Sequence, residues 1–118
     1  MRIESLGSAE PFITKDNSEI RELAGLPTGN SVNQSLAQAT VPAGSATEAH
    51  FHRVTEEIYF FTGGAGRMIL GEQESQVRAG DCVVIPPHVP HGGTAGPQGC
   101  TVIDVFTPPR AGIVALMD

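Results

Sequence analysis

The chain has 118 residues, enough for one domain around a single core. Its 13 acidic and 7 basic side chains give a net charge of −6, and the sequence has no stripe of lysine and arginine, which argues against a nucleic-acid partner. No apolar run approaches the roughly 20 residues that span a bilayer, and the first residues lack the apolar centre of a signal peptide, so we expect a cytoplasmic protein that does not contact a membrane.

Turn-forming residues are frequent, with 14 glycines and 9 prolines, and favour a β-sandwich or β-barrel over a helical bundle. Within residues 12–24, the spaced apolar side chains fit one turn of helix. The polar residues 15–18 fit the turn of a β-hairpin equally well, and periodicity does not choose between the two. After a loop, residues 32–41 predict a strand whose Gln34 and Gln38 are candidates to line the interior.

The most informative stretch covers residues 44–66. His50 and His52 are separated by one residue, so on a β-strand both imidazoles leave the same face and can bind one metal ion. Glu57 begins a strongly β-prone run that ends in the glycines of a turn. Two nitrogens and one oxygen are thereby delivered by adjacent strands.

A second stretch, residues 80–91, supplies a third imidazole. Its short apolar strand, residues 82–85, ends in a proline-rich turn that presents His91. Between the two stretches, residues 67–70 predict the return strand of a hairpin and residues 76–77 a further short strand. All four histidines lie in these two stretches, and imidazole with carboxylate suits first-row divalent metals better than calcium.

The last predicted strand is residues 100–107, which is largely apolar on both faces and is therefore expected to be buried from two sides. The tail that follows, residues 111–117, is also apolar, and we expect it to dock on the barrel. Cys82 and Cys100 lack the C-x-x-C spacing of a redox motif, so we expect two buried, reduced cysteines.

The two histidine-bearing stretches resemble the signature motifs of the cupin superfamily, G-x5-H-x-H-x(3,4)-E-x6-G and G-x5-P-x-G-x2-H-x3-N. The matching residues are Gly44, His50, His52, Glu57 and Gly64 in the first motif, and Gly80, Pro86 and His91 in the second. His88 stands where the pattern has glycine, and Ala95 where it has asparagine. Histidine adopts the backbone conformation that glycine supplies more readily than most residues do.

The resemblance implies an all-β fold, the double-stranded β-helix or jelly roll of the cupin barrel. It implies one domain in which residues 1–31 form amino-terminal strands or an arm, residues 32–107 the barrel and residues 108–118 the tail. It also favours strands over a helix for residues 12–24, and a homodimer.

The same resemblance implies one bound divalent transition metal: Fe, Mn, Ni, Co, Cu or Zn. Three imidazoles and one carboxylate leave two positions open on a six-coordinate ion, unlike a closed structural site. Glu56 also satisfies the looser spacing, but only Glu57 places Gly64 six residues further on, so we expect Glu56 to face outward. The expected ligands are His50, His52, Glu57 and His91.

Two residues are candidates for a catalytic role. His88 has an intrinsic pKa near neutrality and can transfer a proton at the mouth of the pocket, although its place between two prolines also fits an exposed loop. Tyr59 shares the strand parity of Glu57, as does Phe61, so both rings should face the metal cavity.

We expect a metal-dependent enzyme whose small oxygen-rich or aromatic substrate chelates the ion, with dioxygenation favoured among the reactions that the resemblance implies. The alternative is a non-catalytic protein that binds a small molecule or a metal. A further alternative is an isomerase, a decarboxylase or a polyketide cyclase, including an enzyme similar to sugar-phosphate isomerases. The last of these needs basic residues near the cavity, and only Arg53 and Arg67 are close in sequence.

Overall fold

The computed structural model describes residues 1–110 and is built almost entirely of antiparallel β-strands. The elements in chain order are η1 (Leu6–Ser8), β1 (Phe12–Ile13), β2 (Glu19–Ala24), β3 (Ser35–Val41), β4 (Glu56–Leu70), β5 (Gln73–Arg78), β6 (Cys82–Ile85) and β7 (His91–Thr107). The predicted all-β fold is therefore confirmed. No helix among the described residues has the length and hydropathy needed to cross a membrane.

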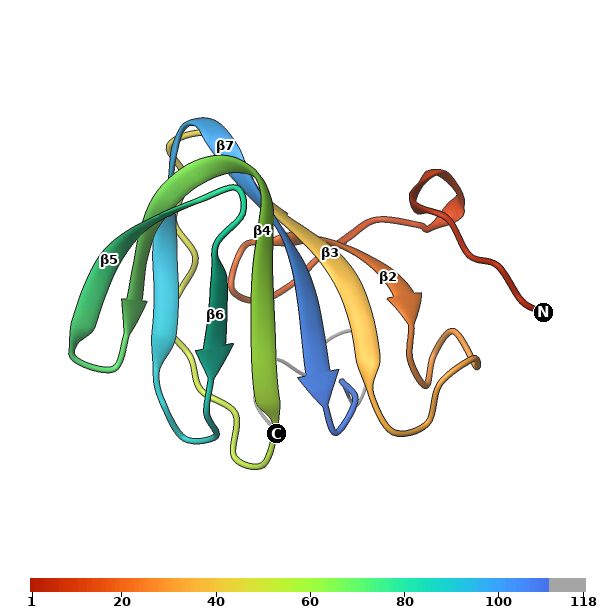
Figure 1. Ribbon diagram of the computed structural model, residues 1–118. Helices are drawn as coiled ribbons and strands as arrows, with labels where there is room; N and C mark the ends of the chain where they lie inside the picture. Colours follow the sequence, from red (N-terminus) through yellow and green to blue (C-terminus); the bar gives the residue numbers. More distant parts are fainter. Residues whose placement is uncertain (111–118) are drawn as a thin grey trace.

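The two long strands, β4 and β7, pair with each other along most of their length and arch over the top of the molecule (Figure 1). The first half of β4 lies between β6 and β7, and its second half lies between β5 and β7. Each long strand thus belongs to both walls of the barrel. Strand order β1-β2-β3-β7-β4-β5 completes the sheet, with β6 added at β4.

The glycines in the middle of β4 bend this strand and do not reverse it. The register with β7 shifts between Phe61 and Gly63 and again between Gly64 and Gly66, which are the irregularities of β-bulges. The prediction that residues 67–70 return in a hairpin with the preceding run is therefore wrong. A bulge that contains glycine curves a strand while it keeps the same partner, and spacing alone does not distinguish it from a turn.

In strand β3, every second side chain faces the core. Its small residues Ser35, Ala37 and Ala39 are buried, and Gln38 between them lies on the outer face, half-buried. Gln34 precedes the strand and is exposed. The prediction that the two glutamines line the interior is therefore wrong, because the pairing of β3 with β7 fixes the opposite parity.

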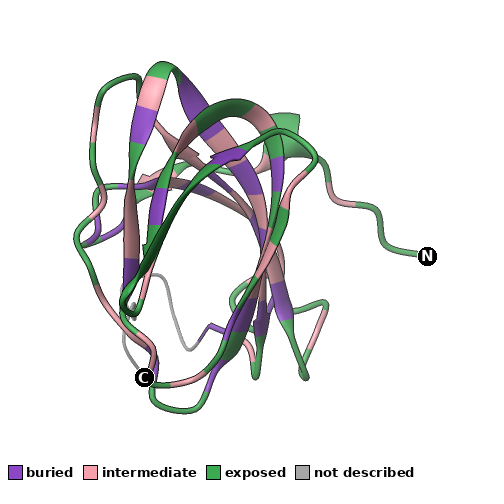
Figure 2. Ribbon diagram, turned by 60° about the vertical axis from the view of Figure 1, so that its left-hand side comes forward, coloured by how far each residue is buried: buried purple, intermediate pink, exposed green. Residues whose placement is uncertain are grey.

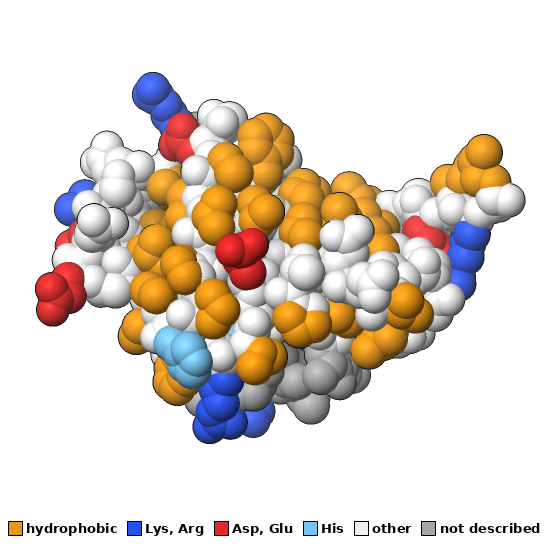
Figure 3. Space-filling view, turned by 60° about the horizontal axis from the view of Figure 1, so that its bottom comes forward, with side chains coloured by type: hydrophobic (Ala, Val, Ile, Leu, Met, Phe, Trp, Pro, Cys, Tyr) orange, Lys and Arg blue, Asp and Glu red, His pale blue; other side chains and the backbone are white. Residues whose placement is uncertain are grey.

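The barrel interior is filled by small and medium apolar side chains, and buried positions alternate with exposed ones along the strands (Figure 2). The buried cluster consists of Ile20, Ala37, Ala39, Phe61, Met68, Val77, Ile85, Ala95, Cys100 and Val102. Hydrophobic side chains also gather over much of one outer face (Figure 3). Exposed large hydrophobic residues on the strands include Phe60, Ile69 and Val84.

Residues 12–24 form the hairpin and not the helix: Phe12 pairs with Ile20, and the turn at residues 14–18 joins β1 to β2. Asn17 in this turn has a φ of 75°, a conformation that asparagine tolerates better than most residues. The tail at residues 111–117, predicted to dock on the barrel, lies outside the described residues.

The two cysteines are both free thiols, but they differ in burial. Cys100 is buried as predicted, whereas Cys82 is exposed, so that part of the prediction is wrong. Strand β6 buries Ile85, and its alternation turns Cys82 and Val84 to the outside.

Candidate metal centre

The segment that carries His50 and His52 is extended, but it joins the barrel through two isolated bridges and not through a continuous strand. One bridge pairs His50 with His91: each backbone N–H donates to the carbonyl of the other residue, at 3.0 and 2.9 Å. Directly paired residues place their side chains on the same face, and the two rings lie 4.4 Å apart between centroids. Backbone pairing thus brings together histidines that are 41 positions apart.

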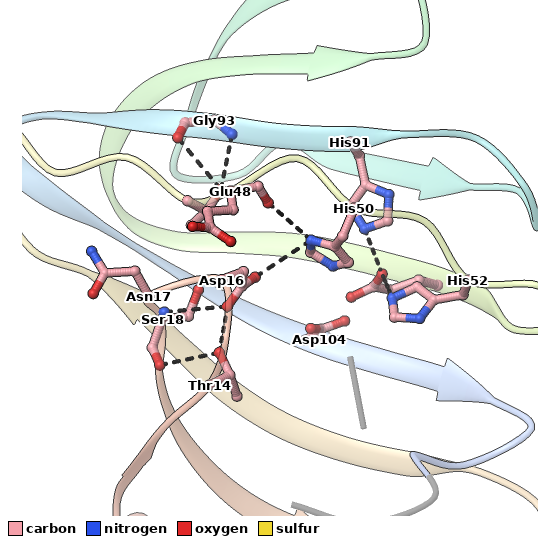
Figure 4. A network of polar contacts seen from close by, with 12 residues as sticks. Thr14, Asp16, Asn17, Ser18, Glu48, His50, His52, His91, Gly93 and Asp104 are labelled. Carbon is pink, nitrogen blue, oxygen red and sulfur yellow. Dashed lines mark hydrogen bonds and ion pairs between the residues drawn. The ribbon is translucent and has the colours of Figure 1, made fainter. Parts of the chain in front are cut away.

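The structure gathers three histidines into one cluster (Figure 4). His50, His52 and His91 each offer one ring nitrogen, and these three atoms lie within 4.8 Å of one another. Only 4% of His52 and 1% of His91 are exposed, while His50 is less buried. The cluster therefore opens on the side of His50.

Glu57 is the carboxylate that reaches this cluster. It is 1% exposed, and its Oε1 lies 3.3 Å from Nε2 of His52 and 3.1 Å from Nε2 of His91. Burial alone would raise the pKa of Glu57, but the neighbouring imidazoles outweigh burial and hold this pKa well below its ordinary value. Glu56 is exposed because successive side chains of β4 point to opposite faces.

Two of the histidines are held through Nδ1 by backbone carbonyls. Nδ1 of His50 lies 3.1 Å from the carbonyl of Glu48, and Nδ1 of His91 lies 3.0 Å from that of Val89. A carbonyl can only accept, so each Nδ1 carries the proton and each Nε2 keeps a lone pair. This is the arrangement of histidines that bind a metal through Nε2.

The fit to a cation follows from the contact between Glu57 and His91. Oε1 of Glu57 and Nε2 of His91 are both buried and lie 3.1 Å apart, and among residues 1–110 neither atom has a hydrogen-bond partner. Two lone pairs at this distance repel each other unless a positive charge lies beside them. Burial alone would lower the pKa of His91, but the adjacent negative charge of Glu57 outweighs burial and raises this pKa, so the site favours a positive charge between the two groups.

A second group of buried charged residues adjoins the cluster from β7 and the residues that follow it. Asp104 faces inward, and burial together with the negative charge of Glu57 raises its pKa well above the ordinary value. Nη2 of Arg110 lies 4.0 Å from Oδ2 of Asp104, and the guanidinium carbon of Arg110 lies 4.6 Å from the centre of the Phe106 ring. That ring in turn contacts His52 at 5.2 Å between centroids.

Asp104 and Arg110 adjoin the candidate site but were not predicted from the sequence. One signal was available for Asp104, because it is the only charged residue in the otherwise apolar run at residues 100–107. A buried carboxyl in such a strand needs a partner, which makes it a candidate for a functional site. Arg110 had no comparable signal, since the sequence does not show that the chain after β7 is buried.

The two candidate catalytic residues differ in burial. Tyr59 points inward with its ring 6.3 Å from that of His91, and burial together with the charge of Glu57 raises its pKa well above the ordinary value. His88 is exposed, with its ring 6.5 Å from that of Phe51. Its φ of 69° is the glycine-like conformation of the motif position, and its N–H donates to the carbonyl of His52 at 2.7 Å.

Fold and site together define a class: a small β-barrel with three histidines and one glutamate converging in its interior. Residues 37–106 match the family model of the cupin domain. A protein of Methanocaldococcus jannaschii, itself uncharacterized, is 48% identical over 82 residues, which are 70% of this chain and 66% of that relative. The chain belongs to the cupin family, and its match spans about two thirds of the length of this relative.

Solved structures share the same jelly-roll architecture. KdgF from Halomonas sp. superposes with a TM-score of 0.81 at 20% identity, covering 94% of this chain and 96% of its own. The polyketide cyclase RemF from Streptomyces resistomycificus gives 0.81 at 23% identity, covering 98% and 85%. A predicted oxalate decarboxylase from Thermotoga maritima gives 0.78 at 20% identity, covering 92% and 99%. At these identities the likeness shows the fold alone.

Proposed function

We propose that this protein is a metal-dependent enzyme that acts on a small, oxygen-rich substrate bearing a carboxylate. The observation that carries the proposal is the position of a buried acid and a buried cation, Asp104 and Arg110, beside the cluster of three histidines and Glu57. The residues that would hold the ion are His50, His52, Glu57 and His91.

This donor set suits Fe, Mn, Ni, Co, Cu or Zn, and affinity alone does not select among them. Four protein ligands leave two positions on a six-coordinate ion, enough for a chelating substrate. When bound, such an ion supplies Lewis acidity that polarises a substrate oxygen. Everything else in the reaction falls to the side chains around it.

Arg110 supplies the carboxylate-binding group. Its guanidinium is buried, and within the described part of the chain its Nη1 has no hydrogen-bond partner. The carboxyl of Asp104 lies 4.0 Å from Nη2, and Glu22 also interacts electrostatically with this guanidinium. A buried guanidinium that is so weakly paired favours an anionic ligand, and two parallel N–H groups match a carboxylate.

Asp104 supplies the proton. Burial and the negative charge of Glu57 raise its pKa well above the ordinary value, which favours the protonated carboxyl as a donor to the bound substrate. Glu57 stays ionised beside it, so the two carboxyl groups are assigned opposite protonation states. Such a pair favours proton-transfer reactions such as isomerisation or decarboxylation, while dioxygenation stays a prediction that needs a redox-active ion.

The sugar-phosphate alternative gains no support from the two arginines considered for it. Arg67 forms an exposed ion pair with Glu74 on the β4–β5 hairpin, and Arg53 is exposed.

The test combines metal loading with a panel of small hydroxy acids, keto acids, sugar acids and sugar phosphates. Binding is followed by thermal shift and calorimetry, and turnover by proton NMR. We expect Arg110→Gln to weaken carboxylate binding by about tenfold or more, the size of a charged hydrogen bond. Arg78→Gln, which removes an exposed arginine, should leave binding unchanged.

Asp104→Asn separates binding from chemistry. The amide is neutral, like the protonated acid it replaces, so binding should persist while turnover falls. Turnover at the wild-type rate in this variant would remove Asp104 from the mechanism. Binding without turnover under every metal would identify a non-catalytic binder, and failure to bind any carboxylate would overturn the proposal.

A further inference from the structure

A buried carboxylate from the amino-terminal hairpin lies against the metal cluster. Asp16 sits in the turn between β1 and β2 and is 8% exposed. Its Oδ1 accepts hydrogen bonds from the hydroxyl of Thr14 and from the backbone N–H of Ser18. Its Oδ2 is turned towards His50 and lies 3.8 Å from Nδ1 (Figure 4).

Backbone contacts hold this turn against the segment that carries His50. The N–H of Glu48 donates to the carbonyl of Asp16 at 3.1 Å, and the side-chain amide of Asn17 donates to the carbonyl of Ala46 at 3.5 Å. The turn therefore docks on two points of the segment, both upstream of the histidine. Hydrogen bonds from Thr14 and Ser18 fix the carboxylate of Asp16 within the docked turn.

The N–H at Nδ1 of His50 faces two oxygens, the carbonyl of Glu48 at 3.1 Å and the carboxylate of Asp16 at 3.8 Å. A negative charge beside Nδ1–H favours this tautomer and makes the opposite nitrogen, Nε2, a better ligand. It also attracts the imidazole more strongly once Nε2 donates its lone pair to a cation. Carbonyl and carboxylate thus act on one ring from the same side.

We propose that Asp16 is a positioning residue for the metal ligand His50, and that metal affinity therefore depends on the amino-terminal hairpin. The inference rests on the metal site proposed above and adds a residue that no cupin motif of the sequence contains. By linkage the dependence is reciprocal: if the docked turn strengthens metal binding, metal binding must strengthen docking of the turn. Among the strands of residues 1–110, β1 pairs with β2 alone, so docking of this turn has few other supports in the sheet.

The test measures affinity for Zn²⁺ as the probe, by competition with a chromophoric chelator. Asp16→Asn is compared with Glu48→Gln, which removes the same charge from the same contact region, at an exposed side chain. Loss of a group that orients a metal-bound histidine typically costs 10- to 100-fold in affinity. We expect a loss of about tenfold or more for Asp16→Asn and of about twofold or less for Glu48→Gln. Equal losses in the two variants would overturn the proposal.

A measurement on the wild-type protein covers the case in which Asp16→Asn does not fold. Hydrogen exchange of the Glu48 amide, which donates to Asp16, should slow several-fold when Zn²⁺ binds. Unchanged exchange would contradict the coupling. If the wild-type protein binds no Zn²⁺, the metal site itself is wrong; if it binds while Asp16→Asn binds equally well, only the role of Asp16 is wrong.

Discussion

Replacing Gly64 by alanine should destabilise the protein more than replacing Gly44, although the two backbones have nearly the same conformation. Their φ angles are 69° and 71°, and an L-residue in this region costs roughly 1–2 kcal/mol. An added Cβ at Gly44 meets no atom within 4 Å. At Gly64 it would lie 2.0 Å from the carbonyl oxygen and 2.8 Å from the carbonyl carbon of Gly99. Strands β4 and β7 must therefore separate at their crossing.

The magnitude follows from adding the two effects. Forced overpacking costs roughly 1–3 kcal/mol, so Gly64→Ala should lose about 2–5 kcal/mol where Gly44→Ala loses about 1–2. Urea unfolding of both variants without metal measures the difference, because ligand linkage then does not enter. Any change in unfolded-state entropy is the same for the two substitutions and cancels. Equal losses would show that β4 does not cross the backbone of Gly99 so closely.

Three further predictions concern charge, metal and packing. Burial raises the pKa of Glu22 although the charge of Arg110 opposes this, so the fold loses stability as pH rises from the pKa of Glu22 in the unfolded chain to its higher pKa in the folded protein. Glu22→Gln should therefore raise the melting temperature at pH 7 and leave it unchanged at pH 4. His52→Ala should remove most bound metal, and unchanged metal content by elemental analysis would refute the ligand assignment. Ile85, 1% exposed and paired with Glu57 in the sheet, should cost about 2–5 kcal/mol in urea unfolding when replaced by alanine, and a loss below about 1 kcal/mol would contradict its place in the core.

The residues of the candidate metal centre could be selected from the sequence because β-structure has a strict period. One residue between His50 and His52 fixes their common face, and the same rule separates buried Glu57 from exposed Glu56. The third histidine came from a second motif with its own spacing. These predictions needed local geometry alone, together with a resemblance that joined the two motifs.

The parts that failed depend on register and curvature. The parity of Gln38 follows from which residue of β7 lies opposite it, Ile103, and nothing within residues 32–41 specifies that partner. The bend in β4 depends on two bulges against β7, which sequence spacing presents as a turn. Pairing between distant segments decides both features.

Asp16 and Asp104 were missed for the same reason, because their roles depend on contacts between distant segments. Each is a single acidic residue in a segment with another evident role, a turn in one case and a core strand in the other. Their relation to the metal cluster arises only when the hairpin docks on the segment before His50 and when β7 lies beside β4. Contacts of this kind span tens of residues and leave no periodic trace in the chain.

The pairing of β4 with β7 also explains how groups for binding an ion and for transferring a proton can be held in fixed relation. Along β4, Glu57 and Tyr59 lie opposite Phe106 and Asp104, and at the other end of β7 His91 lies opposite Leu70. The spacing between ligand and acid is thus set by backbone hydrogen bonds across one ladder, which are far stiffer than side-chain packing on separate loops. His50 and His52 are the exceptions, since both stand on a segment attached by isolated bridges, and His50 is the candidate ligand that a second carboxylate, from the hairpin, faces. A candidate ligand that stands outside the long strands therefore has an additional contact from the amino-terminal hairpin.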